Sequence, residues 1–310
     1  MSAADHDMTD AARRAEMQAR WMLGVLCIIW GVTWPAMRIA LDEMPPLTMR
    51  AGTAISGALA LYLICLVGRR DLRLPSARAF LHVAIAGLLN IALFSLTTAY
   101  AQLIATTSRV AVLAYTMPIW SMLLAWPVLG ERPNQAQIIA LGLCILGLGI
   151  LIYPLTGHGL PLGVLLALGT GISWAAGTIY VKWARIKADP MSVACWQMIV
   201  ACVFLIGCML VGEGAPDVAR MHVGGLAAVL WTGVVGNGVA YALWFSVVPR
   251  LPALTASLGI LGTPAVGVVS SMLVLGEVPT LADSAGFALI FASSACVLLA
   301  RPAAPADPTP

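Results

Sequence analysis

The sequence contains ten long apolar segments, each close to the length that a helix needs to cross a lipid bilayer. A membrane-spanning helix uses about 20 mainly apolar residues. The segments do not alternate apolar and polar residues, as the strands of a membrane barrel do. We therefore predict an all-α polytopic membrane protein with ten transmembrane helices, near residues 21–41, 47–68, 79–101, 107–129, 135–155, 160–181, 191–211, 222–245, 253–275 and 282–300.

Composition and motifs exclude several classes of function. Hydrophobic residues make up 60% of the chain and charged residues only 10%, which excludes a soluble enzyme, a nucleic-acid-binding module and a disordered protein. The chain has no phosphate-binding loop, and its seven cysteines show no metal-ligand spacing. We therefore expect no catalytic residue, no metal site and no cofactor.

The acidic residues indicate how the protein could be energised. All 14 Asp and Glu residues lie in loops, in tails or at the ends of apolar segments. Proton relays in membrane pumps use acidic or histidine side chains inside the membrane. We therefore expect facilitated or gradient-driven transport rather than an intramembrane enzyme.

The distribution of basic residues predicts the orientation, because cytoplasmic loops carry an excess of Lys and Arg. If the N-terminus is cytoplasmic, most of the 17 Lys and Arg residues fall on that side, and the exceptions are Arg38, Arg50, Arg109 and Arg220. Ten spans return the C-terminus to the same side. Both termini are therefore predicted to be cytoplasmic, with tails at residues 1–20 and 301–310.

A motif recurs along the chain at a fixed distance. Pro118 and the run Leu129-Gly130-Glu131 reappear 146 residues later as Pro264 and Leu275-Gly276-Glu277. Nearer the N-terminus the displacement is 144 residues, and the matched pairs are Trp30 and Trp174, Arg38 and Lys182, and Pro46 and Pro190. The chain therefore divides into two five-span repeats, residues 21–155 and 156–300.

The odd number of spans in each repeat determines how the two repeats relate. The second repeat must enter the membrane with the opposite orientation, so we predict two inverted five-helix repeats. Inverted repeats related by an axis in the membrane plane are typical of secondary transporters. A channel can be built in the same way, so the repeat favours transport without specifying alternating access.

The repeated motif resembles a known family. The stretches 100–152 and 241–299, with Pro118, Pro264 and the two Leu-Gly-Glu runs, resemble the two EamA-type halves of the drug/metabolite transporter superfamily. The resemblance implies ten helices in two inverted EamA repeats, with a cavity between the halves. It also implies export of small metabolites across the bacterial inner (plasma) membrane. The aromatic residues near the expected cavity look most like the YddG-type amino-acid exporters.

Two asparagines lie in the middle of apolar segments. Asn90 lies in the third segment, and Asn237 lies in the eighth between Gly236 and Gly238. An amide inside a membrane is costly unless it is hydrogen-bonded. The pair could line a cavity and bind amino or carboxyl groups, or it could join neighbouring helices, and the two glycines could let the backbone open.

Several aromatic residues lie too deep to be interfacial anchors. Trp30 and Trp34 are one turn apart in the first segment, so both rings face one side of the helix. Tyr115, Trp174 and Tyr241 are similarly deep. Such rings could stack on planar or aliphatic substrates, or they could pack against neighbouring helices.

The prolines within apolar segments are candidate hinges. Pro118 and Pro264 occupy matched positions of the two repeats, and Pro35 follows Trp34 in the first segment. A proline frees a backbone carbonyl one turn earlier, which could accept a hydrogen bond from a substrate. The alternative is a kink that serves only packing.

Charged residues at the segment ends allow more modest interpretations. Arg50 and Arg109 could reach lipid headgroups, pair with Asp42 or Glu43, or attract anionic groups. Glu131 and Glu277 follow glycines at helix ends, and we expect each to cap the next helix.

These observations predict a secondary transporter that exports small metabolites, amino acids in particular, through a central cavity by alternating access. The expected substrates are aromatic or large neutral amino acids, and the expected partners are that small molecule and the lipid bilayer, with a monomer possible. The alternative is a multidrug or cationic-amphiphile exporter, or a channel-like pore, of the same fold. The candidate substrate-binding residues are Trp30, Trp34, Asn90, Tyr115, Trp174, Asn237 and Tyr241, and the candidate hinges are Pro118, Pro264, Gly236 and Gly238.

Overall fold

The fold was analysed in a computed structural model that describes residues 3–154, 162–217, 221–247 and 262–299. The described residues are helical apart from short connections and contain no strand. Eight helical segments are long and apolar enough to cross a bilayer, and two further apolar helices are shorter. The prediction of an all-helical, multi-pass membrane protein is therefore confirmed.

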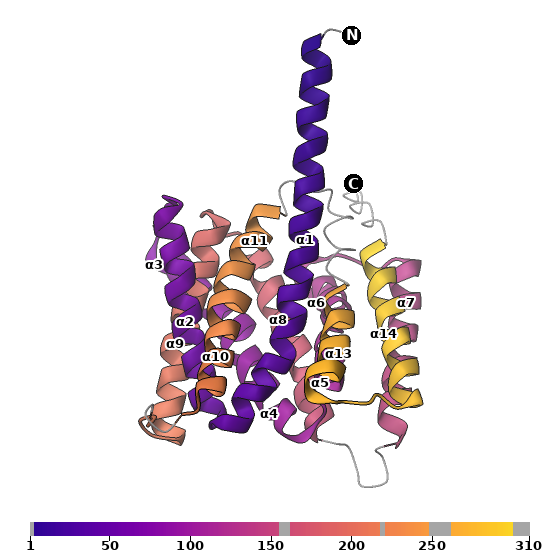
Figure 1. Cartoon of the computed structure of the whole chain (residues 1–310). Helices are drawn as coiled ribbons and strands as arrows, with labels where there is room; N and C mark the ends of the chain where they lie inside the picture. The colour runs from indigo at the N-terminus through magenta and orange to yellow at the C-terminus, as the bar shows by residue number, and fades with distance from the viewer. Residues whose placement is uncertain (1–2, 155–161, 218–220, 248–261, 300–310) are drawn as a thin grey trace.

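Five of the eight long segments and one of the two shorter apolar helices, α14, are single helices. They are α1 (Ala3–Glu43), α2 (Pro46–Val67), α7 (Gln135–Ile152), α8 (Leu162–Ala184), α9 (Pro190–Gly212) and α14 (Leu281–Leu299). The helix α1 does not begin at the predicted span but runs through most of the polar N-terminal stretch, and its first turns project beyond the bundle (Figure 1).

The third, fourth and eighth spans are each assembled from shorter helices. The third span joins α3 (Ala77–Gly87), the π-helix η1 (Leu88–Leu93) and α4 (Phe94–Ile104). The fourth joins α5 (Thr107–Ala114) and α6 (Met117–Leu129). The eighth joins α10 (Val223–Leu230), the π-helix η4 (Trp231–Val239) and α11 (Ala240–Val247), and α13 (Gly262–Leu275) follows.

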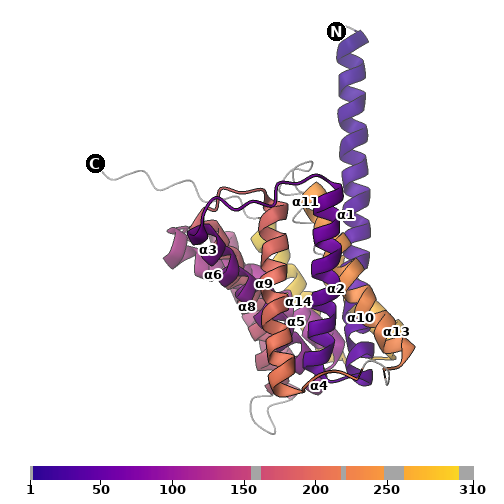
Figure 2. The same cartoon turned by 90° about the vertical axis from the view of Figure 1, so that its left-hand side faces the viewer.

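The helices pack in a bundle in which α1 and α8 contact many neighbours. The helix α1 packs against α10, η4, α11 and α13, and α8 packs against α3, η1, α4, α5 and α6. The helix α2 packs against both η4 and α9, while α7 and α14 pair at one edge of the bundle (Figure 1). Figure 2 shows α2 and α9 running side by side along the neighbouring face of the bundle.

The Leu-Gly-Glu motif ends a helix in both places where it occurs. Gly130 and Gly276 have φ angles of +74° and +67°, a left-handed conformation that closes a helix and that glycine adopts without strain. The next helix then begins with its own cap. Asn134 caps α7 together with Gln137, and Thr280 exchanges hydrogen bonds with Asp283 at the start of α14.

The prediction that Glu131 and Glu277 each cap the helix that follows them is wrong. Glu277 caps α5 instead of α14, because its carboxylate accepts hydrogen bonds from the backbone nitrogens of Thr107 at 2.6 Å and Ser108 at 2.9 Å. Glu131 forms an exposed ion pair with Lys182 at 2.5 Å. Asn134 and Thr280 perform the capping expected of the glutamates, and their side chains need less length to reach the first turn.

Candidate functional site

The π-helix η4 is held against α1 by a hydrogen bond and close packing. The indole Nε1 of Trp30 donates to the carbonyl oxygen of Gly236 at 3.0 Å. A Cβ at Gly236 would lie 2.8 Å from Oγ1 of Thr33, so the absence of a side chain allows this approach. The wide turns of a π-helix leave backbone carbonyls available for such contacts. Asn237 and its two neighbouring glycines lie within this π-helix.

Three aromatic rings meet beside this contact. The ring of Trp30 lies 6.3 Å from that of Tyr241 in an edge-to-face arrangement and 6.0 Å from that of Trp244. All three side chains are half-buried. The structure therefore brings two candidate binding residues, Trp30 and Tyr241, together, and it adds Trp244, which was not among the candidates.

Asn237 lies on the other side of η4, toward α2. A Cβ at Gly57 of α2 would lie 2.9 Å from Cβ of Asn237. A Cβ at the neighbouring Gly238 would lie 2.5 Å from Cβ of Ala60. These glycines let two helices approach, as small residues do in membrane bundles, so packing is one demonstrated role of this segment.

Asn90 lies within the other π-helix, η1. It is buried, and its Nδ2 donates to Oε1 of Gln197 on α9 at 3.0 Å. Its Oδ1 has no hydrogen-bond partner, and a Cβ at Gly177 of α8 would collide with it. Asn90 therefore joins helices through one half of its amide and leaves the other half unsatisfied.

A second aromatic group surrounds the break in the fourth span. The ring of Trp34 lies 6.3 Å from that of Tyr115. Tyr115 caps the end of α5, and Pro118 is the second residue of α6. The helix thus breaks at Tyr115 and Thr116, directly before the proline that the sequence marked as a hinge.

Trp174 and Pro264 lie apart from these groups. The Trp174 ring packs on Phe94 of α4 at 5.4 Å. Pro264 is buried in the first turn of α13, and residues 248–261, which precede this helix, lie outside the described residues. The candidate residues therefore form several clusters between helices rather than one continuous wall.

The carbonyl that Pro35 frees is already used within the protein. The carbonyl oxygen of Gly31, one turn before Pro35, lies 3.3 Å from Oγ of Ser270 on α13. Pro35 lies inside α1, and the helix continues on both sides of it. This carbonyl therefore ties α1 to α13, and the expectation that it would be open to a substrate is wrong in this conformation.

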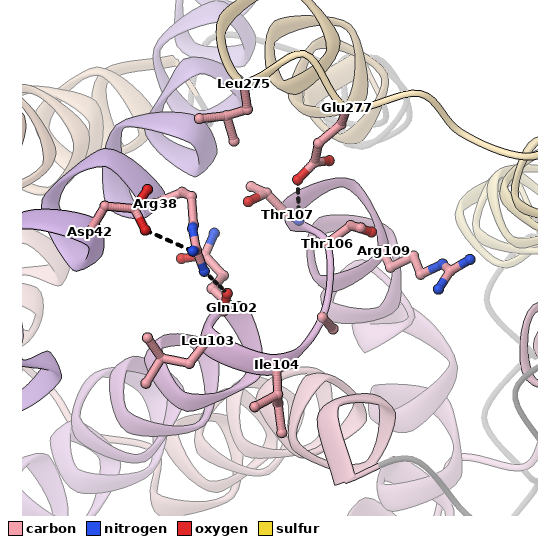
Figure 3. A pocket seen from close by; sticks show the side chains of 11 residues that line it. Arg38, Asp42, Gln102, Leu103, Ile104, Thr106, Thr107, Arg109, Leu275 and Glu277 are labelled. Carbon is pink, nitrogen blue, oxygen red and sulfur yellow. Dashed lines mark hydrogen bonds and ion pairs between the residues drawn. The ribbon is translucent and has the colours of Figure 1, made fainter. Parts of the chain in front are cut away.

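An opening in the described part of the chain lies at one end of the bundle. It has a volume of about 590 Å³ and lies where α1, α4 and α13 end and α5 begins (Figure 3). Its lining is mixed polar and apolar, and includes Arg38, Asp42, Gln102, Thr107 and Glu277. None of the candidate binding residues lines it.

Charges at this opening are paired. Arg38 forms an ion pair with Asp42 at 2.7 Å and also donates to the carbonyl of Gln102 (Figure 3). Arg109 makes a two-point contact with Asp283, at 2.5 Å from Nε and 3.0 Å from Nη2. The expectation that Arg109 reaches lipid or pairs with Asp42 or Glu43 is therefore wrong.

Two buried amide side chains were not among the candidate residues predicted from the sequence. Gln197 binds Asn90, and the fully buried Gln102 donates from Nε2 to the carbonyl oxygen of Trp34 at 3.2 Å. Both lie inside apolar helices, the same signal that identified Asn90 and Asn237. Among the described residues, no group of acidic, histidine or cysteine side chains has the arrangement of a metal site.

Arg50 is the other residue whose place differs from the sequence expectation. It does not reach the surface, because only 3% of it is exposed. Its Nη1 lies 3.0 Å from Sδ of Met37, and its Nε and Nη2 have no hydrogen-bond partner. The structure therefore contains a deep cation that the sequence placed near the outer face.

The comparisons with known proteins agree with the helical architecture. The uncharacterized transporter YoaV of Bacillus subtilis (strain 168) is 25% identical over 87% of this chain and 93% of its own. A protein named probable terminal-alkyne amino-acid exporter, from Streptantibioticus cattleyicolor, is 25% identical over 84% of this chain and 87% of its own. A crystal structure of a protein that is 21% identical shares the fold, with a TM-score of 0.65 over 91% of this chain and 98% of that one.

The family assignment rests on two matches that together span most of the sequence. The EamA-like transporter family matches residues 19–153 and again residues 161–299. The resemblance inferred from the repeated motif is thereby confirmed. The chain belongs to the EamA-like transporter family.

Proposed function

We propose that this protein is a secondary transporter that exports amino acids across a bacterial inner membrane by alternating access. The proposed path runs between two inverted five-helix repeats, and both termini face the cytoplasm. Each chain carries both repeats, so the proposed transport unit is a monomer. The observation that carries the proposal is a set of reciprocal contacts made by the third and eighth spans, in and directly before their π-helices.

The first reciprocal pair involves glycines that approach a backbone. A Cβ at Gly87 would lie 2.6 Å from the carbonyl oxygen of Gln197, and a Cβ at Gly233 would lie 2.6 Å from that of Thr53. The glycines are 146 residues apart, and Thr53 and Gln197 are 144 apart. The contact between the third span and α9 thus corresponds to one between the eighth span and α2.

The second reciprocal pair follows the same displacements. Asn90 packs on Gly177, and Gly236 packs on Thr33. Again the members are displaced by 146 and 144 residues. Contacts that exchange the two halves of the chain support a two-fold relationship, and five spans in each half place its axis in the membrane plane.

The inverted relationship supports alternating access. Two equivalent halves can exchange conformations, which exposes a site between them first to one side and then to the other. The π-helices and the break at Tyr115 and Thr116 are the segments best suited to this exchange, because their backbone bonding is already irregular. The candidate hinges Pro118, Gly236 and Gly238 lie in or next to these segments, while Pro264 lies in the first turn of α13.

The charge distribution supports the orientation. With the N-terminus in the cytoplasm, the end of α1 that carries Arg38 and Asp42 faces outward, so the opening of about 590 Å³ faces outward too. The described conformation would then be the one from which an exported substrate leaves.

The clusters of aromatic residues support an amino-acid substrate. The groups of Trp30 with Tyr241 and of Trp34 with Tyr115 offer faces and edges for aliphatic or aromatic side chains. The similar protein from Streptantibioticus cattleyicolor bears the name of an amino-acid exporter. We therefore propose Trp30, Trp34, Asn90, Tyr115, Trp174, Asn237 and Tyr241 as the residues that contact substrate during the cycle.

The experiment is counterflow in proteoliposomes that are preloaded with unlabelled amino acids, with a labelled amino acid outside. A carrier gives saturable, transient accumulation, stronger for aromatic and large aliphatic amino acids. Flux that does not saturate and shows no counterflow would indicate a channel-like pore. Absence of any amino-acid signal, with accumulation of cationic amphiphiles, would replace the proposal with a multidrug exporter.

A further inference from the structure

The guanidinium of Arg50 is buried on α2 without a counter-ion among the described residues. Its one polar contact is to the thioether of Met37, which is a weak acceptor. Its Nε and Nη2 have no partner at all. A buried charge that is neither paired nor hydrogen-bonded is strongly unfavourable, so a cation kept in this state calls for an anion that binds it during the working cycle.

The carboxylates at this end of the bundle do not supply that anion. Glu213 accepts from the backbone nitrogens of Leu47 at 2.8 Å and Thr48 at 2.7 Å, in the first turn of the helix that carries Arg50. Four further carboxylates at this end have partners of their own: Asp42 pairs with Arg38, Glu43 with His222, Glu277 with the start of α5, and Asp283 with Arg109. Asp217, in the connection after α9, also has an interaction of its own.

The free edge of Arg50 is the one that binds a carboxylate best. The Nε and Nη2 groups of an arginine form a fork that matches the two oxygens of a carboxylate. Arg109 uses this same edge, Nε and Nη2, to hold Asp283. In Arg50 the same edge is buried and has no hydrogen-bond partner, so no internal ion pair uses it.

Other unsatisfied or aromatic groups approach the same turn of α1 as Arg50. Arg50 contacts Met37, while Gln102 binds the carbonyl of Trp34 and leaves its own Oε1 without a partner. Trp34 in turn meets the ring of Tyr115. A cation, an amide acceptor and two aromatic rings therefore converge on residues 34–37 of α1.

The outward opening reaches this layer but does not include Arg50. Gln102 lines the opening and donates to the carbonyl of Trp34, in the turn of α1 that Arg50 also contacts. Arg38 follows that turn along α1, also lines the opening and donates to the carbonyl of Gln102 (Figure 3). The position displaced by 144 residues from Arg50 is Ala194, so the second half contributes no equivalent cation. One end of a bound molecule would thus be anchored at the first half only.

We propose that Arg50 binds the carboxylate of the transported molecule. This inference rests on the proposed export of amino acids and specifies its substrate class as carboxylates. The fork of Nε and Nη2 holds the two oxygens, Oε1 of Gln102 is available to an amino group, and Trp34 and Tyr115 contact the side chain. In the described conformation the guanidinium of Arg50 does not line the opening and has no anionic partner. The proposed ion pair between Arg50 and the substrate carboxylate therefore forms in another conformation of the cycle.

The test compares four related probes on the purified full chain: L-phenylalanine, phenylacetate, L-phenylalaninamide and phenethylamine. Binding is measured by thermal shift in detergent, and transport by counterflow in proteoliposomes. The wild type is expected to bind the two carboxylates better than the two amines. Arg50→Gln is expected to weaken carboxylate binding by about 10- to 100-fold, the loss typical of a charge-assisted hydrogen bond, and to leave amine binding unchanged.

Two further variants keep the result interpretable. Arg50→Lys retains the charge without the fork, so partial carboxylate binding is expected, and it covers the case in which Arg50→Gln does not fold. Arg70→Gln is the matched control, since Arg70 lies at the opposite end of the bundle in an exposed pair with Asp189 at 3.5 Å. It is expected to keep the wild-type preference among probes.

The outcomes separate this inference from the proposed function. Arg50-dependent binding of phenylacetate without binding of phenylalanine would uphold the carboxylate site and reject amino-acid export. Counterflow of phenylalanine that is unchanged in Arg50→Gln would uphold amino-acid export and overturn the role of Arg50. A wild type that binds no carboxylate probe, or that prefers the amines, overturns it as well.

Discussion

The carboxylate of Glu277 lies 2.6 Å from the backbone nitrogen of Thr107, which joins the end of α13 to the start of α5. A second oxygen of Glu277 accepts from the backbone nitrogen of Ser108 at 2.9 Å. Thr107 and Glu277 are 170 positions apart, so this helix cap connects the second half of the chain to the first. It also forms part of the wall of the outward opening.

Replacing this cap should weaken the contact between the halves. Glu277→Gln removes the charge that complements the N-terminus of α5, and the unfolding free energy should fall by about 1–3 kcal/mol, the worth of charge-assisted hydrogen bonds. The matched control is Glu131→Gln, at the equivalent position of the first half. Its ion pair with Lys182 is exposed, so a change below about 1 kcal/mol is expected. Equal melting temperatures of Glu277→Gln and Glu131→Gln in detergent would contradict the role of Glu277 as the cap of α5.

Breaking the ion pair between Arg109 and Asp283 should destabilise the protein more than replacing the Glu277 cap does. The Asp283 side chain is 7% exposed, so Arg109→Gln leaves a buried carboxylate without its cation, at a cost of about 3 kcal/mol. The double variant Arg109→Gln with Asp283→Asn removes both charges and should recover much of that loss. A melting curve of the double variant no better than that of Arg109→Gln would show that the pair does not act as a unit.

The helices were predictable because their signal is local. A run of about 20 apolar residues specifies a membrane helix from composition alone, and the displaced motif at Gly130 and Gly276 identified the repeat. The π-helices were not predictable, since they depend on how the third and eighth spans meet their neighbours. The glycines and asparagines in them were visible in the sequence, but the widening of the turn was not.

The candidate binding site was harder to predict from the sequence than the helices were, because it depends on how side chains of different helices pack. Trp30 and Trp34 were predicted to face one side of the same helix, and in the structure they contact different neighbours, Tyr241 and Tyr115. Arg50 was expected near the outer face because it lies near the end of an apolar segment, and lipid, Asp42 or Glu43, and anionic groups were its possible partners. Distance from a segment end does not report which direction a side chain takes, and that direction depends on packing.

The close approach at η1 can be tested with single methyl groups. A Cβ at Gly87 would lie 2.6 Å from the carbonyl oxygen of Gln197, a backbone atom that cannot swing away. Gly87→Ala should therefore destabilise the protein by about 1–3 kcal/mol and reduce transport. Gly207→Ala on α9 is the control, because no atom lies within 4 Å of its added Cβ, and it should be neutral or slightly stabilising. Similar melting temperatures for both variants would argue against tight packing at η1.

The last prediction concerns the candidate binding residues as a group. Alanine at Trp30, Asn90, Tyr115, Trp174 or Asn237 should lower counterflow of aromatic amino acids while the protein stays folded. The structure adds a distinction, because Asn90→Ala also leaves Oε1 of Gln197 without its donor, which costs about 1–3 kcal/mol. The double variant Asn90→Ala with Gln197→Leu removes both amides and should restore stability. If it restores transport as well, Asn90 only joins helices, whereas stability regained without transport is the result expected of a residue that contacts substrate. Wild-type counterflow in all five single variants would contradict the proposed cavity.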